Sequence, residues 1–157
     1  YRVGGGRMKE LKVSAINKGT VIDHIPSGKG LKVLEILNLP KDSTILVAIN
    51  VKSRKLGKKD IIKVEGKILS EDEVNKIALI APTATVNIID KWEVVDKKKV
   101  EVPDEIVGII KCANPNCITN YEEVKPKFKV ISKKPLKLKC HYCERTMEEG
   151  MVVKNLL

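Results

Sequence analysis

The sequence predicts an α+β protein in two parts: an antiparallel sheet with two helices on one face, then a small antiparallel β domain built around a metal. Three observations support this. Runs rich in β-branched residues alternate with two helical patterns over the first two thirds of the chain. The composition shifts at Val102-Pro103-Asp104, and all four cysteines follow that shift. A chain of 157 residues has room for two such units.

The first elements are an extended segment, a strand and a helix. Apolar positions alternate imperfectly over residues 11–25, and Asn17-Lys18-Gly19 is a turn signal before the strand proper. Ser27 can cap a helix whose apolar positions, within Leu31–Leu37, recur at helical spacing. Pro40 ends that helix.

Two strands and a second helix come next. Ser43–Val51 and Asp60–Val64 are rich in β-branched residues and predict neighbouring strands. Ser70 begins a capping box, because a glutamate follows it three residues later and the first turn carries three carboxylates. The helix is expected to run to about Ile80, since Pro82 stops it.

A strand at Thr83–Ile89, a turn at Asp90-Lys91 and a strand at Trp92–Val95 complete the first part. The order is strand, helix, strand, strand, helix, strand, with one extra hairpin strand. That order is the split βαβ pattern of a ferredoxin-like sheet covered on one face by two helices.

The second part contains only short strand candidates. These lie around the cysteines, at Ile106–Ile110, Phe128–Ile131, Leu136–Leu138 and Met151–Val153. We therefore expect a small antiparallel module over residues 103–157, a first domain over residues 8–102 and a flexible leader over residues 1–7.

The cysteines predict a metal centre. Their spacing is Cys112-x4-Cys117-x22-Cys140-x2-Cys143, two close pairs that a loop can bring together around a tetrahedral Zn²⁺. His141 lies between two of them, but four thiolates leave no vacancy, so the site is structural. Disulfides are the first alternative, although the chain does not resemble a small secreted domain. An iron–sulfur cluster is the second.

The charge is strongly basic, with a formal net charge of +10. Polyanions are the obvious partners of such a chain. One Trp, one Phe and three Tyr offer few stacking platforms, however, which argues against a nucleic-acid binder. Most of the lysines are consistent with a solvated surface of the kind found in thermophiles.

Enzymatic and membrane functions have weak support. With two histidines, no pairing of a nucleophile with a base and no open metal shell, the sequence does not predict an active site. No run of 18 apolar residues and no signal-peptide pattern occurs, so we expect a cytoplasmic protein.

Four segments together resemble one family. Residues 19–26 (GTVIDHIP), 57–63 (GKKDIIK) and 81–87 (APTATVN), with the cysteine spacing, are similar to the regulatory chain of aspartate carbamoyltransferase. The resemblance extends from about Leu11 to the C-terminus. It implies a non-catalytic subunit in pyrimidine biosynthesis that binds cytidine triphosphate as inhibitor and adenosine triphosphate as activator, and also uridine triphosphate. It further implies a regulatory homodimer whose zinc domain docks on the catalytic chain.

The resemblance also implies the nucleotide site. Alternation alone places Lys59, Ile61 and Lys63 on one face of a strand, with two ammonium groups flanking an apolar contact. Asp23 would accept hydrogen bonds from ribose hydroxyls and His24 would act by protonation, although both could equally be ordinary polar residues of a turn or a dimer face. The residues that match the family's site are Val13, Ala15, Ile16, Val21, Asp23, His24, Ile61, Lys63, Asn87, Ile89, Trp92, Val94 and Lys97.

Two further expectations remain open. Asn114, Asn120 and Glu144 lie near the cysteines, where rigid loops could present them to a partner chain, but they could equally be turn formers. A basic zinc ribbon joined to a ferredoxin-like domain and binding nucleic acid is the alternative function.

Overall fold

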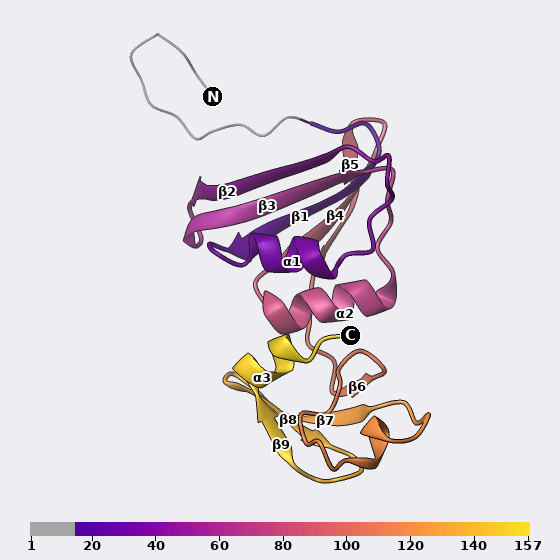
Figure 1. The fold of residues 1–157 in the computed structure, drawn as a ribbon. Coiled ribbons are helices and arrows are strands. Elements are labelled where there is room, and N and C mark those ends of the chain that lie inside the picture. Colours follow the sequence, from indigo (N-terminus) through magenta and orange to yellow (C-terminus); the bar gives the residue numbers. More distant parts are fainter. Residues whose placement is uncertain (1–14) are drawn as a thin grey trace.

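The computed structural model describes residues 15–157, which form two antiparallel sheets and three α-helices (Figure 1). The predicted α+β class is therefore confirmed. The predictions for Val13 and for the leader lie outside the described residues.

The elements follow one another in this order: β1 Gly19–Pro26, α1 Gly30–Ile36, β2 Ile45–Ser53, β3 Gly57–Glu65, α2 Glu71–Ile80, β4 Thr85–Asp90, β5 Glu93–Lys99, β6 Glu105–Val107, a 3₁₀ turn at Ile118–Asn120, β7 Lys127–Lys133, β8 Leu136–Cys140, β9 Thr146–Glu148 and α3 Glu149–Lys154.

The larger sheet has the strand order β2-β3-β1-β4-β5, with all neighbours antiparallel. Its first four strands have the arrangement predicted for a ferredoxin-like sheet, and β5 adds the extra hairpin strand at one edge. Helices α1 and α2 cover the same face of the sheet, the face turned toward the smaller sheet (Figure 1). The opposite face, called the open face below, carries no helix.

Helix α2 begins as its sequence predicts. The backbone amide of Glu73 donates to Ser70 Oγ at 3.2 Å, and the backbone amide of Ser70 donates to Glu73 Oε1 at 3.1 Å. The Glu73 carboxylate is buried, pairs with Lys67 at 3.1 Å and accepts from the backbone amide of Asn38 at 3.0 Å. The capping box therefore also ties α2 to the segment that follows α1.

Helix α1 begins differently from the prediction. Ser27 does not cap it; its hydroxyl donates to Asn50 instead. The amides of Gly28 and Gly30 donate to the buried carboxylate of Asp60 on β3, at 3.1 and 2.8 Å. The partner lies 30 residues from Gly30 in sequence, so no local pattern could have indicated it.

The β4–β5 hairpin turns one residue later than predicted. Asp90 pairs with Glu93, which leaves Lys91 and Trp92 as a two-residue turn with φ of 51° and 69°. Positive φ at both central positions is the geometry that matches the twist of a hairpin. Trp92 therefore lies in the turn, and the prediction that it belongs to the strand is wrong.

The smaller sheet has the order β6-β7-β8-β9, and α3 follows its last strand. The predicted strand at Met151–Val153 is wrong, because these residues lie within α3, where Val152 is fully buried. Only the first part of the predicted strand Ile106–Ile110 pairs with a neighbour, as β6. Ile110 instead forms an isolated bridge with Leu156 near the C-terminus.

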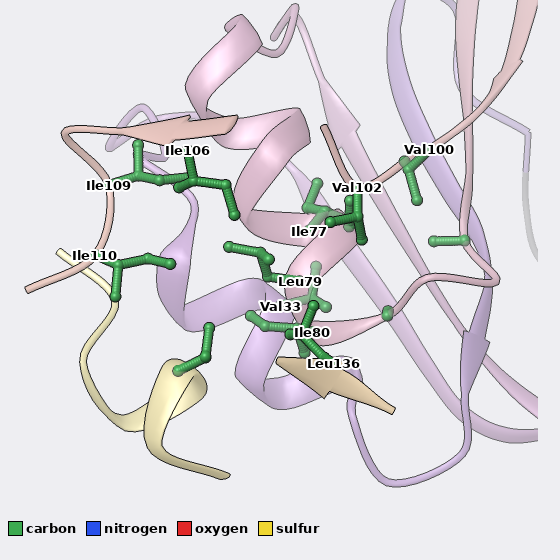
Figure 2. Packing of buried hydrophobic residues seen from close by; sticks show 14 of the residues in the cluster. Val33, Ile77, Leu79, Ile80, Val100, Val102, Ile106, Ile109, Ile110 and Leu136 are labelled. Atoms are coloured by element: carbon green, nitrogen blue, oxygen red, sulfur yellow. The ribbon is translucent and has the colours of Figure 1, made fainter. Parts of the chain in front are cut away.

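One hydrophobic core passes through both parts of the chain. Figure 2 shows side chains from α1, α2 and the smaller sheet gathered around α2, among them Val33, Leu79, Ile80, Ile106 and Leu136. All five are at most 6% exposed. Burial on this scale stabilises the contact between the two sheets as well as each sheet. Within residues 15–157, no helix is long and apolar enough to cross a bilayer.

Candidate functional site

The open face of the larger sheet carries one cross-strand row of predicted site residues. Lys63 on β3 and Asn87 on β4 both lie opposite Val21 on β1, and Lys97 on β5 lies opposite Asn87. Leu46 on β2 lies opposite Lys63 at the far end of the row. Directly opposed residues share a face of a sheet, so two lysines and an amide lie in line across the strands.

An apolar floor lies beside this row. Ile16, Val21, Ile61 and Ile89 form a buried cluster, separate from the main core, and Leu46 and Ala48 pack against it. Four of these six residues were predicted, and period-two alternation along β2 could have found Leu46 and Ala48. The floor is a flat apolar surface of the kind on which a planar ring can lie.

An ion pair lies next to the floor. Asp23 Oδ1 is 3.0 Å from Lys59 Nζ, and both side chains are largely buried, at 21% and 17% exposure. Burial lowers the pKa of Lys63 from its ordinary value, and Asp23 opposes this effect. An added negative charge nearby would stabilise the protonated form of Lys63.

His24 is the extra residue of a β-bulge in β1. Ile22 and Ile25 are both fully buried on the helix-covered side, although residues three apart on a regular strand face opposite sides. The φ of 56° at His24 inserts the additional residue. The ring Nδ1 lies 3.0 Å from Thr85 Oγ1, so Thr85, which was not predicted, belongs to this region.

The charges around His24 disfavour its protonation. Burial lowers the pKa of His24 below its ordinary value, and the lysines Lys59, Lys55 and Lys97 lower it further, while Asp23 opposes them. Three cations therefore lie near enough to act on one ring. This concentration of positive charge on the open face is suited to an anion.

Asn87 has an unmet hydrogen-bonding capacity. The residue is 9% exposed, and its Oδ1 is buried without a hydrogen-bond partner among residues 15–157. A buried acceptor without a donor costs free energy, so such an atom commonly marks a place where a ligand donates.

The remaining predicted residues lie at the periphery. Val94 lies opposite Ile89 and is 57% exposed, Trp92 is 64% exposed in its turn, and Ala15 is exposed at the start of the described chain. Asp96 precedes Lys97 in the sequence, and its negative charge could weaken the attraction of that lysine for phosphate. It lies opposite Ile88, on the helix-covered side, and therefore faces away from Lys97.

The four predicted metal ligands come together in the second part of the chain. Their Sγ atoms all lie within 4.8 Å of one another, and two pairs, Cys112–Cys143 and Cys117–Cys140, are 3.7 Å apart. A disulfide would need about 2.05 Å. Four sulfurs at about 2.3 Å from a central ion form a tetrahedron with edges of about 3.8 Å, so the separations fit a metal.

Short turns hold the ligands in place. The backbone amide of Cys117 donates to the Asn114 carbonyl at 3.0 Å, and the Asn120 amide group donates to the same carbonyl at 2.7 Å. In the second pair, the backbone amide of Glu144, whose φ is 62°, donates to the Cys140 carbonyl at 3.0 Å. Asn114 and Asn120 thus act as turn formers. Their contact with a partner chain stays a prediction.

The thiols need a cation in order to ionise together. Burial raises the pKa of Cys112 and of Cys140. Burial also acts on Cys143, but the Arg145 backbone amide and the Asn114 side chain outweigh it and lower the pKa of that thiol to about 7. A metal ion would displace the remaining protons and form a closed thiolate shell, which is the structural type of site.

Two family models match the sequence in the same order as the two parts of the structure. Residues 11–101 match the aspartate carbamoyltransferase regulatory chain, allosteric domain. Residues 104–153 match the aspartate carbamoyltransferase regulatory chain, metal binding domain.

Curated proteins of the same description are similar over nearly their whole length. The sequence is 94% identical to the aspartate carbamoyltransferase regulatory chain of Thermococcus sibiricus over 150 residues, which cover 96% of this chain and 100% of the relative. It is 70% identical to that of Pyrococcus horikoshii, covering 95% and 100%. Identity to that of Methanocaldococcus jannaschii is 56%, covering 90% and 95%.

Proposed function

The chain belongs to the family of aspartate carbamoyltransferase regulatory chains, and from that premise we propose that its open face binds nucleoside triphosphates. The chain is a regulatory, non-catalytic subunit with an allosteric domain and a metal-binding domain. Its partner is the catalytic chain of the same enzyme. The division of labour that we propose gives nucleotide binding to residues 8–102 and docking to residues 103–157.

The observation that carries the nucleotide proposal is the cross-strand row of Lys63, Val21, Asn87 and Lys97 beside the apolar floor. The floor suits a planar base, the lysines suit phosphates, and Asn87 Oδ1 offers an acceptor to a donor of the ligand. Asp23 can accept from ribose hydroxyls. We assign cytidine triphosphate as inhibitor and adenosine triphosphate as activator at this one site, with uridine triphosphate as a further effector.

We assign the metal as Zn²⁺. Four thiolates in a tetrahedral arrangement match the ligand preference of zinc, and the Sγ separations of 3.7 Å match its bond lengths. The ion would hold the two cysteine turns and supply folding free energy to the smaller sheet. Residues presented by those turns, among them His141 and Tyr142, are exposed and available to the catalytic chain.

A homodimer is part of the proposal. β2 is an edge strand of the larger sheet, and Val47 and Ile49 on it are 37% and 45% exposed. An exposed apolar edge strand pairs readily with another edge. Two copies joined there would form a regulatory dimer able to bridge catalytic subunits, in the cytoplasm and within pyrimidine biosynthesis.

One experiment tests the assignment. The chain is mixed with the aspartate carbamoyltransferase catalytic chain of the same organism, and gel filtration is followed by aspartate saturation curves with and without cytidine triphosphate. We expect a larger particle whose half-saturating aspartate concentration rises with the nucleotide. Thermal melting with cytidine triphosphate or single-stranded RNA forms the second arm. Strong stabilisation by RNA and none by nucleotide would overturn the proposal.

A further inference from the structure

Lys29 is in contact with all three helices. It precedes α1, where its carbonyl accepts from the backbone amide of Val33 at 3.0 Å. Its Nζ lies 3.1 Å from the carbonyl oxygen of Ile80, the last residue of α2, and 3.2 Å from Glu149 Oε1, the first residue of α3. An ammonium group at the C-terminus of one helix and a carboxylate at the N-terminus of another are both favourable to the helix dipoles.

The residues on either side of Lys29 are hydrogen-bonded to β3, the strand that also carries Lys63. The amides of Gly28 and Gly30 donate to Asp60 Oδ2 at 3.1 and 2.8 Å. A Cβ at position 30 would lie 2.8 Å from that same oxygen, so the helix and the strand are in close contact. Asp60 lies between Lys59 and Ile61, which alternation places on the open face.

Glu149, the carboxylate partner of Lys29, is close in the chain to the cysteine cluster. It directly follows β9, and Thr146 of β9 lies opposite Lys139 of β8. The next residue of β8 is the ligand Cys140, and Cys143 lies in the turn between the two strands.

We propose that Lys29 is a positioning residue for allosteric control, which transmits nucleotide occupancy from β3 through Asp60 and α1 to Glu149 and the metal domain. The proposal rests on the nucleotide site assigned above. Lys29 belongs neither to the row of proposed nucleotide-site residues nor to the cysteine cluster, so its effect is on the coupling between the two domains and not on either site. A coupling of this kind requires an element with two arrangements.

The Lys29 ammonium group can have two sets of partners that differ little in free energy. Its ammonium group can hold both Ile80 and Glu149, or keep the Ile80 carbonyl and release the carboxylate to water. The Lys29 and Glu149 side chains are 40% and 52% exposed, so water replaces either partner easily. A small displacement of α1 by β3 decides between the two arrangements, and α3 moves with the outcome.

The test uses the assembled enzyme, this chain with its catalytic chain, carrying Lys29→Met, Glu149→Met, both together, or Lys29→Arg. Lys32→Met is the matched control, because Lys32 lies on the same helix and pairs with Glu35, three residues away, at 3.5 Å. Three quantities are measured: the shift in half-saturating aspartate caused by cytidine triphosphate, the nucleotide affinity of the free regulatory chain, and its thermal midpoint.

We expect Lys29→Met and Glu149→Met each to reduce the nucleotide-induced shift by about twofold, the scale of an exposed ion pair. The double variant should lose no more than either single variant, while Lys29→Arg and Lys32→Met keep the full shift. The nucleotide affinity of the free regulatory chain should not change, and its thermal midpoint should fall only slightly in Lys29→Met and Glu149→Met, because each loses a favourable contact at a helix end. A full shift in Lys29→Met, or additive losses in the double variant, would overturn the proposal. If the unsubstituted regulatory chain shows no nucleotide affinity, the proposed function itself is wrong, and this outcome is distinct from a failure of the Lys29 proposal.

Discussion

Lys63 and Asn87 lie on either side of Val21, in one row across three strands of the larger sheet. A cation and an unpartnered acceptor are thereby held about two strand spacings apart, roughly 10 Å. That separation suits a ligand with a phosphate at one end and a donor at the other. The backbone ladder positions both groups, so neither depends on a mobile loop.

Replacing Lys63 with methionine should weaken nucleotide binding without lowering the thermal stability of the chain. Burial lowers the pKa of Lys63, so folding disfavours its protonated form, and the variant should melt at the same temperature or higher. Its affinity for cytidine triphosphate should fall by about tenfold or more. Titration calorimetry measures the affinity and scanning calorimetry the midpoint. Lys58→Met, an exposed change on the same strand, is the control, and equal losses in both variants would remove Lys63 from the site.

Nucleotide binding should take up a proton at His24. The pKa of His24 lies below 6.5 in the free chain, and a bound triphosphate raises it. The gain in affinity is therefore complete below the pKa of the free chain and is lost as the pH rises through that of the complex. Calorimetry between about pH 5 and 8 measures the effect. Asparagine tolerates the left-handed backbone, so His24→Asn should remove the pH dependence of nucleotide affinity. Identical pH profiles for the unsubstituted chain and the variant would contradict proton uptake at His24.

The Glu73 carboxylate should make the fold sensitive to acid. Burial would raise its pKa, but the amides of Ser70 and Asn38 and the ammonium of Lys67 outweigh burial and lower it below 4.5. Its stabilising effect is therefore present above about pH 4.5 and is lost as the pH falls through the lowered value. Glu73→Gln should cost about 1–3 kcal/mol at neutral pH in denaturant unfolding. Glu71→Gln, in the same helical turn, is the control, and an equal cost there would refute the assignment.

Gly30 and Gly150 should respond oppositely to alanine. Alanine normally stabilises a helix relative to glycine by about 1 kcal/mol, and a Cβ at Gly150 meets nothing within 4 Å, so Gly150→Ala should raise stability. At Gly30 the added Cβ would lie 2.8 Å from the Asp60 carboxylate, and we expect a loss of about 1–3 kcal/mol. Thermal unfolding measures both, and a stabilising Gly30→Ala would show that α1 can move away from β3.

Metal removal should unfold the smaller sheet and end the association with the catalytic chain. Cys112→Ala should retain no bound metal, whereas His141→Ala, a change between two ligands, should keep one ion per chain. Metal analysis and gel filtration with the catalytic chain measure the two effects. Co²⁺ exchanged into the unsubstituted chain should give the absorption of a tetrahedral thiolate site. A Cys112→Ala chain that still co-elutes normally would contradict the docking role.

Local chemistry accounts for what the sequence predicts well. The capping box of α2 is complete within four residues, and the cysteine pairs need only short turns, so the sequence predicts both the Ser70 and Glu73 cap and the clustering of the four cysteines. The alternation of Lys59, Ile61 and Lys63 needs only the pleat of one strand.

Partners distant in sequence account for the errors. Asp60 on β3 accepts from the first amide of α1, so the prediction that the nearer Ser27 caps this helix is wrong. The β-branched run at Met151–Val153 favours a strand, but burial of Val152 in the shared core holds it as a helix. The opposition of Asn87 and Lys97 depends on the hairpin register, which the Lys91-Trp92 turn sets.

That turn also gives the protein an optical property. Trp92 is the one tryptophan of the chain, its indole is 64% exposed, and its backbone amide donates to the Asn17 carbonyl, next to Ile16 of the apolar floor. An indole in water fluoresces at longer wavelength than one that is covered. At the proposed nucleotide site, a base lying on the floor against this ring would shift or quench the emission, and Trp92 would then report effector binding without a label.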